Sequence, residues 1–306
     1  MPRHFLIDDD LSSAEQRQVL DAADAMKRDR FAARPLAGPK SVAVVFEKPS
    51  TRTRLSFETG IAELGGHPVI IDARTTQLGR GETVEDTAQV LSRFVSAIVI
   101  RTFGHDRIES LAAHASVPVV NALTDLSHPC QVVADLMTIR EERGDLGGAT
   151  LAYIGDGNNM AHSLLLGGAL AGMHVRIASP QGYQPVDSIV ERASAIAVQT
   201  GGSVVVTDDP DGASADADVL YTDVWASMGQ EDDAETRKRA FAGFTVDDRL
   251  VKLASDRVIV LHCLPAHRGE EIAASVIDGP HSRVFNQAEN RLHAQKALLA
   301  FLLDRS

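Results

Sequence analysis

A dense group of hydroxyl and guanidinium groups follows an apolar run early in the chain. The run Ser41–Phe46 has the composition of a buried strand, and Pro49-Ser-Thr-Arg-Thr-Arg54 leads from it into a helical pattern. We expect Ser50 to cap this helix, which leaves the first amides and the positive end of the helix dipole facing outward. Three hydroxyls and two arginines within five residues suit the oxygens of a phosphate. The segment therefore predicts an anion site; the alternative is a capped helix with surface arginines.

Further polar motifs follow apolar runs or open helical patterns. Arg101 comes directly after an apolar run, and His128-Pro-Cys-Gln131 begins a helical pattern. The second half of the chain contains Gly155-Asp-Gly-Asn-Asn-Met160, Asp223-Val-Trp-Ala-Ser-Met-Gly229 and His262-Cys-Leu-Pro265. Taken singly, such residues are more often solvated charges, structural histidines or inert buried cysteines. The motifs are therefore candidates whose roles depend on what the fold brings together.

Short apolar runs alternate with helical patterns, which predicts an α/β fold class with parallel sheets. The expected strands are 41–46, 68–71, 97–100, 118–120, 150–154, 174–178, 203–206, 219–221 and 258–261. The expected helices are 13–28, 51–64, 83–94, 131–143, 160–171, 188–199, 247–253 and 287–303. Three glycines between residues 144 and 148 end the helix before them, so we place a boundary between two similar-sized domains near residue 145.

Composition limits the classes of function. The 306 residues carry a formal net charge of -12, which opposes binding to nucleic acid or to an anionic membrane. No run approaches the roughly 20 apolar residues of a membrane span. Two cysteines, Cys130 and Cys263, make a disulfide framework improbable, and no secretory or transit signal opens the chain. We therefore expect a cytoplasmic protein.

The motifs resemble those of a known family. Pro49-Ser-Thr-Arg-Thr-Arg54 resembles the carbamoyl-phosphate signature of the aspartate and ornithine carbamoyltransferases, and His128–Gln131 resembles their His-Pro-x-Gln element. Arg101 falls where the family has a basic residue beside the carbamoyl group. His262-Cys-Leu-Pro265 and the motif from Asp223 to Gly229 resemble the ornithine branch. The resemblance covers nearly the whole chain. It implies transfer of the carbamoyl group of carbamoyl phosphate to the δ-amine of L-ornithine, giving L-citrulline and phosphate.

The resemblance also implies the residues of the site. The implied catalytic residues are Arg101, His128 and Cys263, the last of which orients the amine and is not a nucleophile. The residues implied to hold carbamoyl phosphate are Ser50, Thr51, Arg52, Thr53, Gln77, Arg101, His128, Pro129, Cys130, Gln131, Cys263, Leu264 and Arg291. The residues implied to hold ornithine are Asn159, Asp223, Ser227 and Met228. No metal ion and no cofactor is implied.

The resemblance implies a domain arrangement and an assembly as well. Residues 1–145 with the C-terminal helix 287–306 would bind carbamoyl phosphate, and residues 146–286 would bind ornithine. The last helix would return to the first domain and carry Arg291 to the phosphate. The loop that contains Gln77 would complete a neighbour's site, which implies a homotrimer. The polar stretch 227–235 is expected to be a lid over ornithine, with an ordinary exposed loop as the alternative. Arginine biosynthesis is the expected pathway.

Several alternatives stay open at this point. Gly155-Asp-Gly157 imitates a dinucleotide-binding turn, but a third glycine would be required where the chain has Met160. A non-catalytic phosphate-binding module would explain only the first motif. Zinc binding by His128 with Cys130, or by His262 with Cys263, lacks the usual ligand spacing. Within the family, the acceptor could be putrescine, N-acetylornithine or aspartate.

Overall fold

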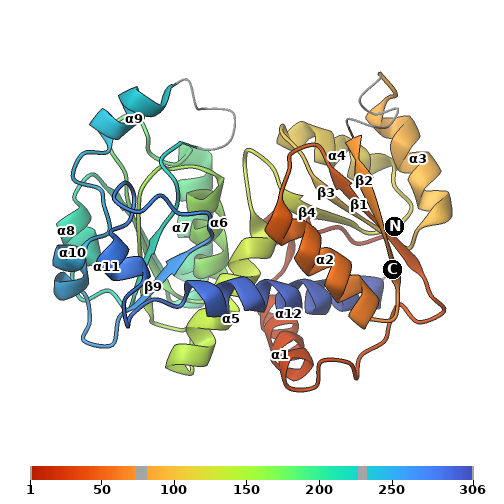
Figure 1. Ribbon diagram of the computed structural model, residues 1–306, viewed down its shortest axis with the longest axis horizontal. Coiled ribbons are helices and arrows are strands. Elements are labelled where there is room, and N and C mark those ends of the chain that lie inside the picture. The colour runs from red at the N-terminus through yellow and green to blue at the C-terminus, as the bar shows by residue number, and fades with distance from the viewer. Residues whose placement is uncertain (1, 74–80, 227–232, 305–306) are drawn as a thin grey trace. The chain divides into compact units, whose positions relative to one another are not determined.

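Two compact units make up the chain in this structure, a computed structural model that describes residues 2–73, 81–226 and 233–304 (Figure 1). Unit 1 comprises Met1–Met137 and Glu289–Ser306, and unit 2 comprises Thr138–Ala288. The chain thus passes between units inside α5 (Pro129–Arg143) and returns inside α12 (Val284–Leu303). The boundary expected near residue 145 lies just after the end of α5, where the glycines end that helix. The contacts of the helix already change from unit 1 to unit 2 after Met137.

Unit 1 is built on a four-stranded parallel sheet in the order β2-β1-β3-β4. Its strands are β1 (Ser41–Phe46), β2 (His67–Asp72), β3 (Ala97–Arg101) and β4 (Val119–Leu123). Its helices, besides parts of α5 and α12, are η1 (Asp8–Asp10, 3-10), α1 (Ser13–Arg28), α2 (Thr51–Glu63), α3 (Val84–Phe94) and α4 (His105–His114). β2 pairs with one side of β1, and β3 pairs with its other side. The ends of β1 and β3 therefore form a topological switch point, where ligands of such sheets bind.

Helices cover both faces of this sheet. Ile98 and Ile100 of β3 pack with Ile108 and Leu111 of α4 in an apolar cluster that also includes Ala88 of α3. On α2, a Cβ at Gly60 would come within 3.1 Å of the Lys296 side chain, so this glycine lets α12 pack closely against α2, as Figure 1 shows. The close packing brings the α12 side chains to the same helix that carries the predicted anion site.

Unit 2 contains a five-stranded parallel sheet in the order β7-β6-β5-β8-β9. Its strands are β5 (Thr150–Ile154), β6 (His174–Ala178), β7 (Ser203–Thr207), β8 (Val219–Thr222) and β9 (Ile259–His262). Its helices are α6 (Asn159–Leu170), α7 (Asp187–Thr200), α8 (Pro210–Ser214), α9 (Ala234–Ala240), α10 (Asp248–Leu253) and α11 (Ala274–Ile277). Here the switch point lies between β5 and β8. The chain leaves these strands at Gly155 and Asp223, so both motifs emerge at the same edge.

The expected fold class is confirmed: two units, each a parallel sheet flanked by helices, with the last helix ending in unit 1. Most expected elements are present within one or two residues. α4 was not expected, because Gly104 precedes it without a side-chain cap and its sequence is largely polar. The short helices α8, α9 and α11 were also not expected. Among the described residues, no helix combines the length and apolar character needed to cross a bilayer.

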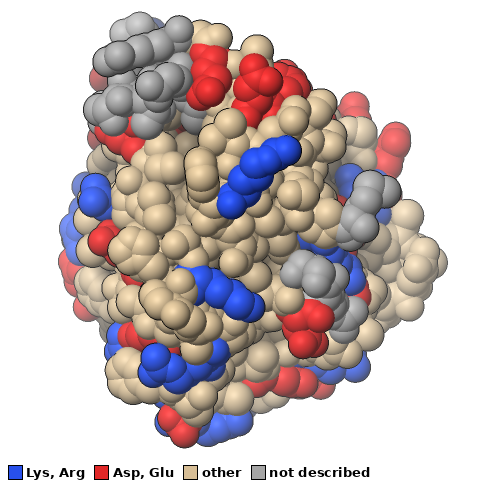
Figure 2. Space-filling view, turned by 90° about the vertical axis from the view of Figure 1, so that its right-hand side faces the viewer, with Lys and Arg blue, Asp and Glu red and all other residues tan. Residues whose placement is uncertain are grey.

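Surface charge on the face shown in Figure 2 is scattered, with single Lys and Arg side chains standing apart among acidic and uncharged ones. Positive charge for an anion can also come from side chains that are mostly buried. Arg101 and Arg291 are such side chains, at 6% and 3% exposure.

Candidate active site

The start of α2 has the geometry of an anion site. Ser50 is its N-cap, and its hydroxyl accepts the Thr53 amide at 3.3 Å and donates to the Thr53 hydroxyl at 2.9 Å. Thr53 is fully buried, whereas Thr51 is exposed. The first amides of a helix have no carbonyl one turn earlier, so they and the helix dipole favour an anion at this end. The cap expected from the sequence is confirmed.

Arg291 reaches this helix from α12. Its guanidinium donates to the Thr53 hydroxyl at 2.8 Å and to the Gln131 amide oxygen at 2.5 Å. The Gln131 amide nitrogen donates in turn to Asp135 at 2.7 Å, which fixes the amide's orientation from the other side. The α2 start, the first turn of α5 and α12 thus converge within unit 1. Ser50, Thr53, Gln131 and Arg291, expected to act together, lie together.

Positive charge surrounds His128. Burial is the largest cause that lowers the pKa of His128 well below its ordinary value, followed by the charges of Arg291, Arg101 and Arg52. These three arginines are therefore close enough to repel a proton on His128, and the imidazole is neutral near pH 7. A neutral imidazole among guanidinium groups can donate a hydrogen bond to an oxygen that gains negative charge. Arg101 occupies the last position of β3, as expected.

The other expected unit 1 residues differ in how they are placed. Pro129 begins α5, a position that suits proline because the first helical amide has no internal partner. The thiol of Cys130 is buried and donates to the Asn121 carbonyl at 3.2 Å, and burial raises its pKa. Cys130 is thus an inert thiol that joins α5 to β4. Gln77 lies outside the described residues.

In unit 2, an acid and a thiol meet at the ends of β8 and β9. The Cys263 thiol donates to the Asp223 carboxylate at 3.0 Å, and the Val224 amide donates to the same oxygen at 2.8 Å. The amide nitrogen of Asn158 lies 3.5 Å from the other Asp223 oxygen. Asn158 also caps α6, because its side-chain oxygen accepts the Met160 amide at 2.9 Å. Asn159, the expected ligand, is the first residue of that helix, whereas Ser227, Met228 and most of the expected lid lie outside the described residues.

His262 is held by a buried acid that sequence reasoning missed. Its Nδ1 accepts the Leu264 amide at 2.9 Å, so the other ring nitrogen carries the proton and donates to Glu271 at 3.1 Å. His262 and Glu271 are both buried. Leu264 has φ +59°, a left-handed conformation that costs a residue with a Cβ about 1–2 kcal/mol. The His262–Glu271 pair thus holds the backbone that follows Cys263 in an uncommon conformation.

An ion pair between the buried Asp156 and the half-buried Arg237 borders Asp223. Burial is the largest cause that raises the pKa of Asp156 to about 6; Asp223 raises it further, while Arg237 lowers it. Arg237 donates to Asp156 at 2.8 Å and to the Trp225 carbonyl at 2.7 Å. The Trp225 ring stacks on Phe241 with centroids 5.6 Å apart. These contacts anchor both sides of the segment between Trp225 and α9.

The alternatives gain little from the geometry of unit 2. A Cβ at Gly157 would lie 2.2 Å from the Pro185 backbone, so the protein's own chain fills the space that a dinucleotide would need at this turn. Asp223, His262 and Cys263 offer possible metal-ligand atoms within 4.8 Å of one another, but both nitrogens of His262 are engaged in the hydrogen bonds above. His262 therefore has no ring nitrogen available to bind a metal ion in this motif.

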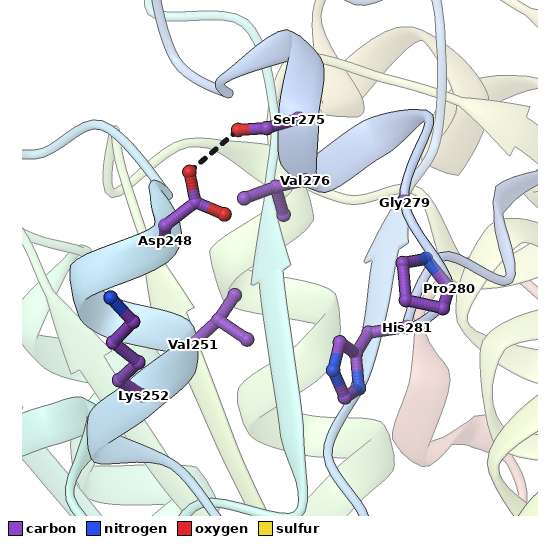
Figure 3. Close-up of a pocket in the computed structure, with 8 residues that line it drawn as sticks. All are labelled: Asp248, Val251, Lys252, Ser275, Val276, Gly279, Pro280 and His281. Atoms are coloured by element: carbon purple, nitrogen blue, oxygen red, sulfur yellow. Dashed lines mark hydrogen bonds between the residues drawn. The ribbon is translucent and has the colours of Figure 1, made fainter.

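A pocket of about 280 Å³ lies between α10 and α11 in unit 2, and none of its lining residues is an expected site residue (Figure 3). The Asp248 carboxylate in it accepts a hydrogen bond from Ser275 at 2.8 Å, and the Lys252 side chain lies along one wall. The pocket lacks the convergence of arginines and helix amides found at the start of α2, so it is not the candidate site.

These features define a class: an α/β enzyme with an anion cradle at one switch point and an acid–thiol pair at another. Residues 3–141 match the aspartate/ornithine carbamoyltransferase carbamoyl-P binding domain, and residues 147–302 match the Asp/Orn binding domain of the same family. The chain therefore belongs to the aspartate/ornithine carbamoyltransferase family.

Individual relatives are similar over nearly their whole length. An ornithine carbamoyltransferase of Acidothermus cellulolyticus is 68% identical, with 99% of this chain and 97% of the relative covered. The ornithine carbamoyltransferase structure from Pyrococcus furiosus is 48% identical, with a TM-score of 0.95 over 99% of this chain and 97% of that chain. An anabolic ornithine carbamoyltransferase structure from Campylobacter jejuni is 38% identical, with a TM-score of 0.95 over 99% of this chain and 100% of that chain.

Proposed function

We propose that this protein transfers the carbamoyl group of carbamoyl phosphate to the δ-amine of L-ornithine, forming L-citrulline and phosphate. The observation that carries the proposal is the convergence of Thr53, Gln131 and Arg291 around a capped helix start, beside a neutral His128. The Asp223–Cys263 contact in unit 2 favours an amine-bearing acceptor. The names of the similar proteins support the same acceptor.

The reaction needs an anion cradle, polarisation of a carbonyl oxygen and alignment of an amine. Unit 1 would bind carbamoyl phosphate: Ser50, Thr51, Arg52, Thr53 and Arg291 would hold the phosphate. Arg101 and His128 would donate to the carbonyl oxygen as it gains negative charge, and Gln131 would hold the carbamoyl nitrogen. The backbone at Pro129 and Cys130 would complete the binding site for carbamoyl phosphate. The neutral amine attacks the carbonyl carbon, the new C–N bond forms, the C–O bond to phosphate breaks, and the amine loses a proton.

Unit 2 would bind ornithine. The Asp223 carboxylate suits the α-ammonium group as a charge-assisted partner. Asn159 would bind the amino-acid head group together with Ser227 and Met228. Cys263 and the Leu264 carbonyl would orient the δ-amine, and Cys263 and Leu264 would also border the carbamoyl group. His262 and Glu271 support this loop through the hydrogen bonds described above.

A substrate panel tests the proposal directly. Carbamoyl phosphate is supplied with ornithine, putrescine, N-acetylornithine or aspartate, and the carbamoylated product is quantified. We expect citrulline from ornithine, with a kcat/KM at least roughly 10-fold above those for the other amines, since each missing charged partner costs about 1.5–3 kcal/mol. Higher activity with another amine would show that this amine, and not ornithine, is the acceptor. The absence of any carbamoylated product would refute the proposal.

We further propose a homotrimer in which Gln77 completes a neighbouring site, a cytoplasmic location and a role in arginine biosynthesis. Exposed apolar side chains on α2 and α3, among them Leu55 and Phe94 at 58% and 75%, support a subunit contact on unit 1. The anabolic description of the Campylobacter jejuni structure supports the biosynthetic direction. Light scattering after gel filtration tests the assembly; a mass of one subunit, near 32.8 kDa, would refute it.

A further inference from the structure

Strand β9 lies at the edge of the unit 2 sheet, so the outward-facing groups of its backbone need partners from outside the sheet. A short segment supplies the first of them: the Val260 amide donates to the His281 carbonyl, and the Arg283 amide donates to the Val260 carbonyl, both at 2.9 Å. Two residues further along the strand, the His262 amide points to the same side. There the backbone of the neighbouring segment has already turned into α12.

Gln287, in the first turn of α12, takes the place of that missing backbone partner. Its side-chain oxygen accepts the His262 amide at 2.9 Å, and its side-chain nitrogen donates to the Tyr221 hydroxyl at 3.0 Å. Gln287 and Tyr221 are both buried. One amide group thus joins the backbone at the end of β9 to the side chain of Tyr221, which belongs to the adjacent strand β8.

The residues that follow these strand ends are those of the acid–thiol pair. Cys263 comes directly after His262, and Asp223 comes two residues after Tyr221. Their side chains are 3.0 Å apart. A buried backbone amide left without an acceptor costs about 1–3 kcal/mol, so without Gln287 the end of β9 would move to find another partner and take Cys263 with it.

We propose that Gln287 is a positioning residue: its amide sets the distance between Asp223 and Cys263 and thereby aligns the amine that attacks the carbamoyl carbon. The inference rests on the proposed function for the identity of that amine. It assigns to Gln287 a role that none of the sequence motifs predicted.

Two variants separate a positioning role from mere packing. Gln287→Met keeps the length of the side chain but removes both hydrogen bonds. Gln287→Glu keeps both, because in either protonation state one oxygen can accept the His262 amide and the other can bond the Tyr221 hydroxyl. Gln295→Met is the matched control: Gln295 is a buried glutamine on the same helix whose side-chain amide has no hydrogen-bond partner among the described residues.

We expect Gln287→Met to lower kcat/KM for ornithine by roughly 10- to 100-fold, while the Kd for inorganic phosphate stays within about twofold. Gln287→Glu should recover activity to within about threefold of wild type, and Gln295→Met should match wild type. Alkylation of Cys263 by iodoacetamide should quicken by at least about threefold in Gln287→Met, because the thiol loses its fixed partner Asp223. Cys130 is buried and does not compete for the reagent.

Activity of Gln287→Met within about twofold of wild type would overturn the inference. Equal losses of activity in the Met and Glu variants, together with equal decreases in Tm, would overturn it too, because they would show a loss of stability only. If wild type carbamoylates none of the amines of the panel, the proposed function fails. The alkylation rates then decide the positioning role alone: equal rates in wild type and Gln287→Met overturn it.

Discussion

Replacing Arg291 with methionine tests the anion cradle at the start of α2. Arg291 is the residue of this cradle that lies farthest from α2 in the sequence. Methionine keeps much of the apolar stem but removes the guanidinium that binds Thr53 and Gln131. If one of its N–H groups also binds the phosphate, the loss is that of a charge-assisted hydrogen bond, about 1.5–3 kcal/mol. The Kd for inorganic phosphate should therefore rise roughly 10- to 150-fold.

Thermal unfolding with phosphate gives a direct measurement. At a phosphate concentration of about 100 times the wild-type Kd, binding adds about 2.7 kcal/mol to the stability of the wild type. A variant with hundredfold weaker binding gains only about 0.4 kcal/mol under the same conditions. The shift in Tm that phosphate causes should thus almost disappear in Arg291→Met, and kcat/KM for carbamoyl phosphate should fall by at least the same factor as the affinity.

Lys296→Met is the control for this measurement. Lys296 is another buried cation on α12, but it donates to Glu63 at 2.8 Å and to the Arg30 carbonyl at 2.5 Å instead of to the cradle. Breaking a buried ion pair costs about 3–5 kcal/mol, so this variant should unfold at a lower temperature yet keep its phosphate affinity. Phosphate affinity of Arg291→Met within about threefold of wild type would refute the assigned cradle.

Three further changes test other parts of the proposal. Asp223→Asn should raise the KM for ornithine roughly 10- to 150-fold and leave the Kd for phosphate within about twofold, and equal effects on both would contradict the division between the units. Since the pKa of His128 lies well below its ordinary value, activity should rise with pH between about 6 and 9 through the ornithine amine, whose pKa resembles the 10.4 of lysine. His128→Asn should lower kcat by roughly 100- to 1000-fold without changing the shape of that profile; a changed shape would show that His128 titrates there. The pKa of Asp156 is about 6, above its ordinary 3.8, so the folded protein binds the extra proton between those values. Its contribution to the free energy of unfolding should therefore fall by about 2 kcal/mol as pH rises from about 4 to 6. Denaturant titrations should show that Asp156→Asn lacks this fall, and an unchanged pH dependence would contradict the raised pKa.

Much of the fold could be predicted because its strands are continuous apolar runs bounded by turn residues. Ser41–Phe46 and Thr150–Ile154 are observed with the expected bounds. The Ser50 cap could be predicted for a similar reason, since a cap depends on residues that are close in sequence. Local chemistry decides such features, and the sequence displays it directly.

Contacts between distant residues could not be derived in the same way. Arg291 and Thr53 are 238 positions apart, and the pattern of the last helix does not reveal which helix it packs against. Family resemblance supplied that expectation. Glu271 was missed because an acid in the run Gly269-Glu-Glu271 has the composition of an exposed loop. It is buried only because the fold brings it beside His262. Likewise, the pair Asn158 and Asn159 does not reveal which member caps α6 and faces Asp223.

Sheet topology explains why motifs that are scattered along the chain gather into two sets. In unit 1, β1 and β3 are neighbouring strands, and the connections that follow them run to opposite sides of the sheet. Thr53, which follows β1, and Arg101, at the end of β3, therefore lie at one edge of the sheet. In unit 2, β5 and β8 do the same for Asn158 and Asp223, and β9 adds Cys263. A parallel sheet needs helical crossovers of a dozen or more residues, so neighbours at such an edge are necessarily far apart in sequence. The long spacing between the motifs is therefore what this architecture requires of a chain that builds one binding edge in each unit.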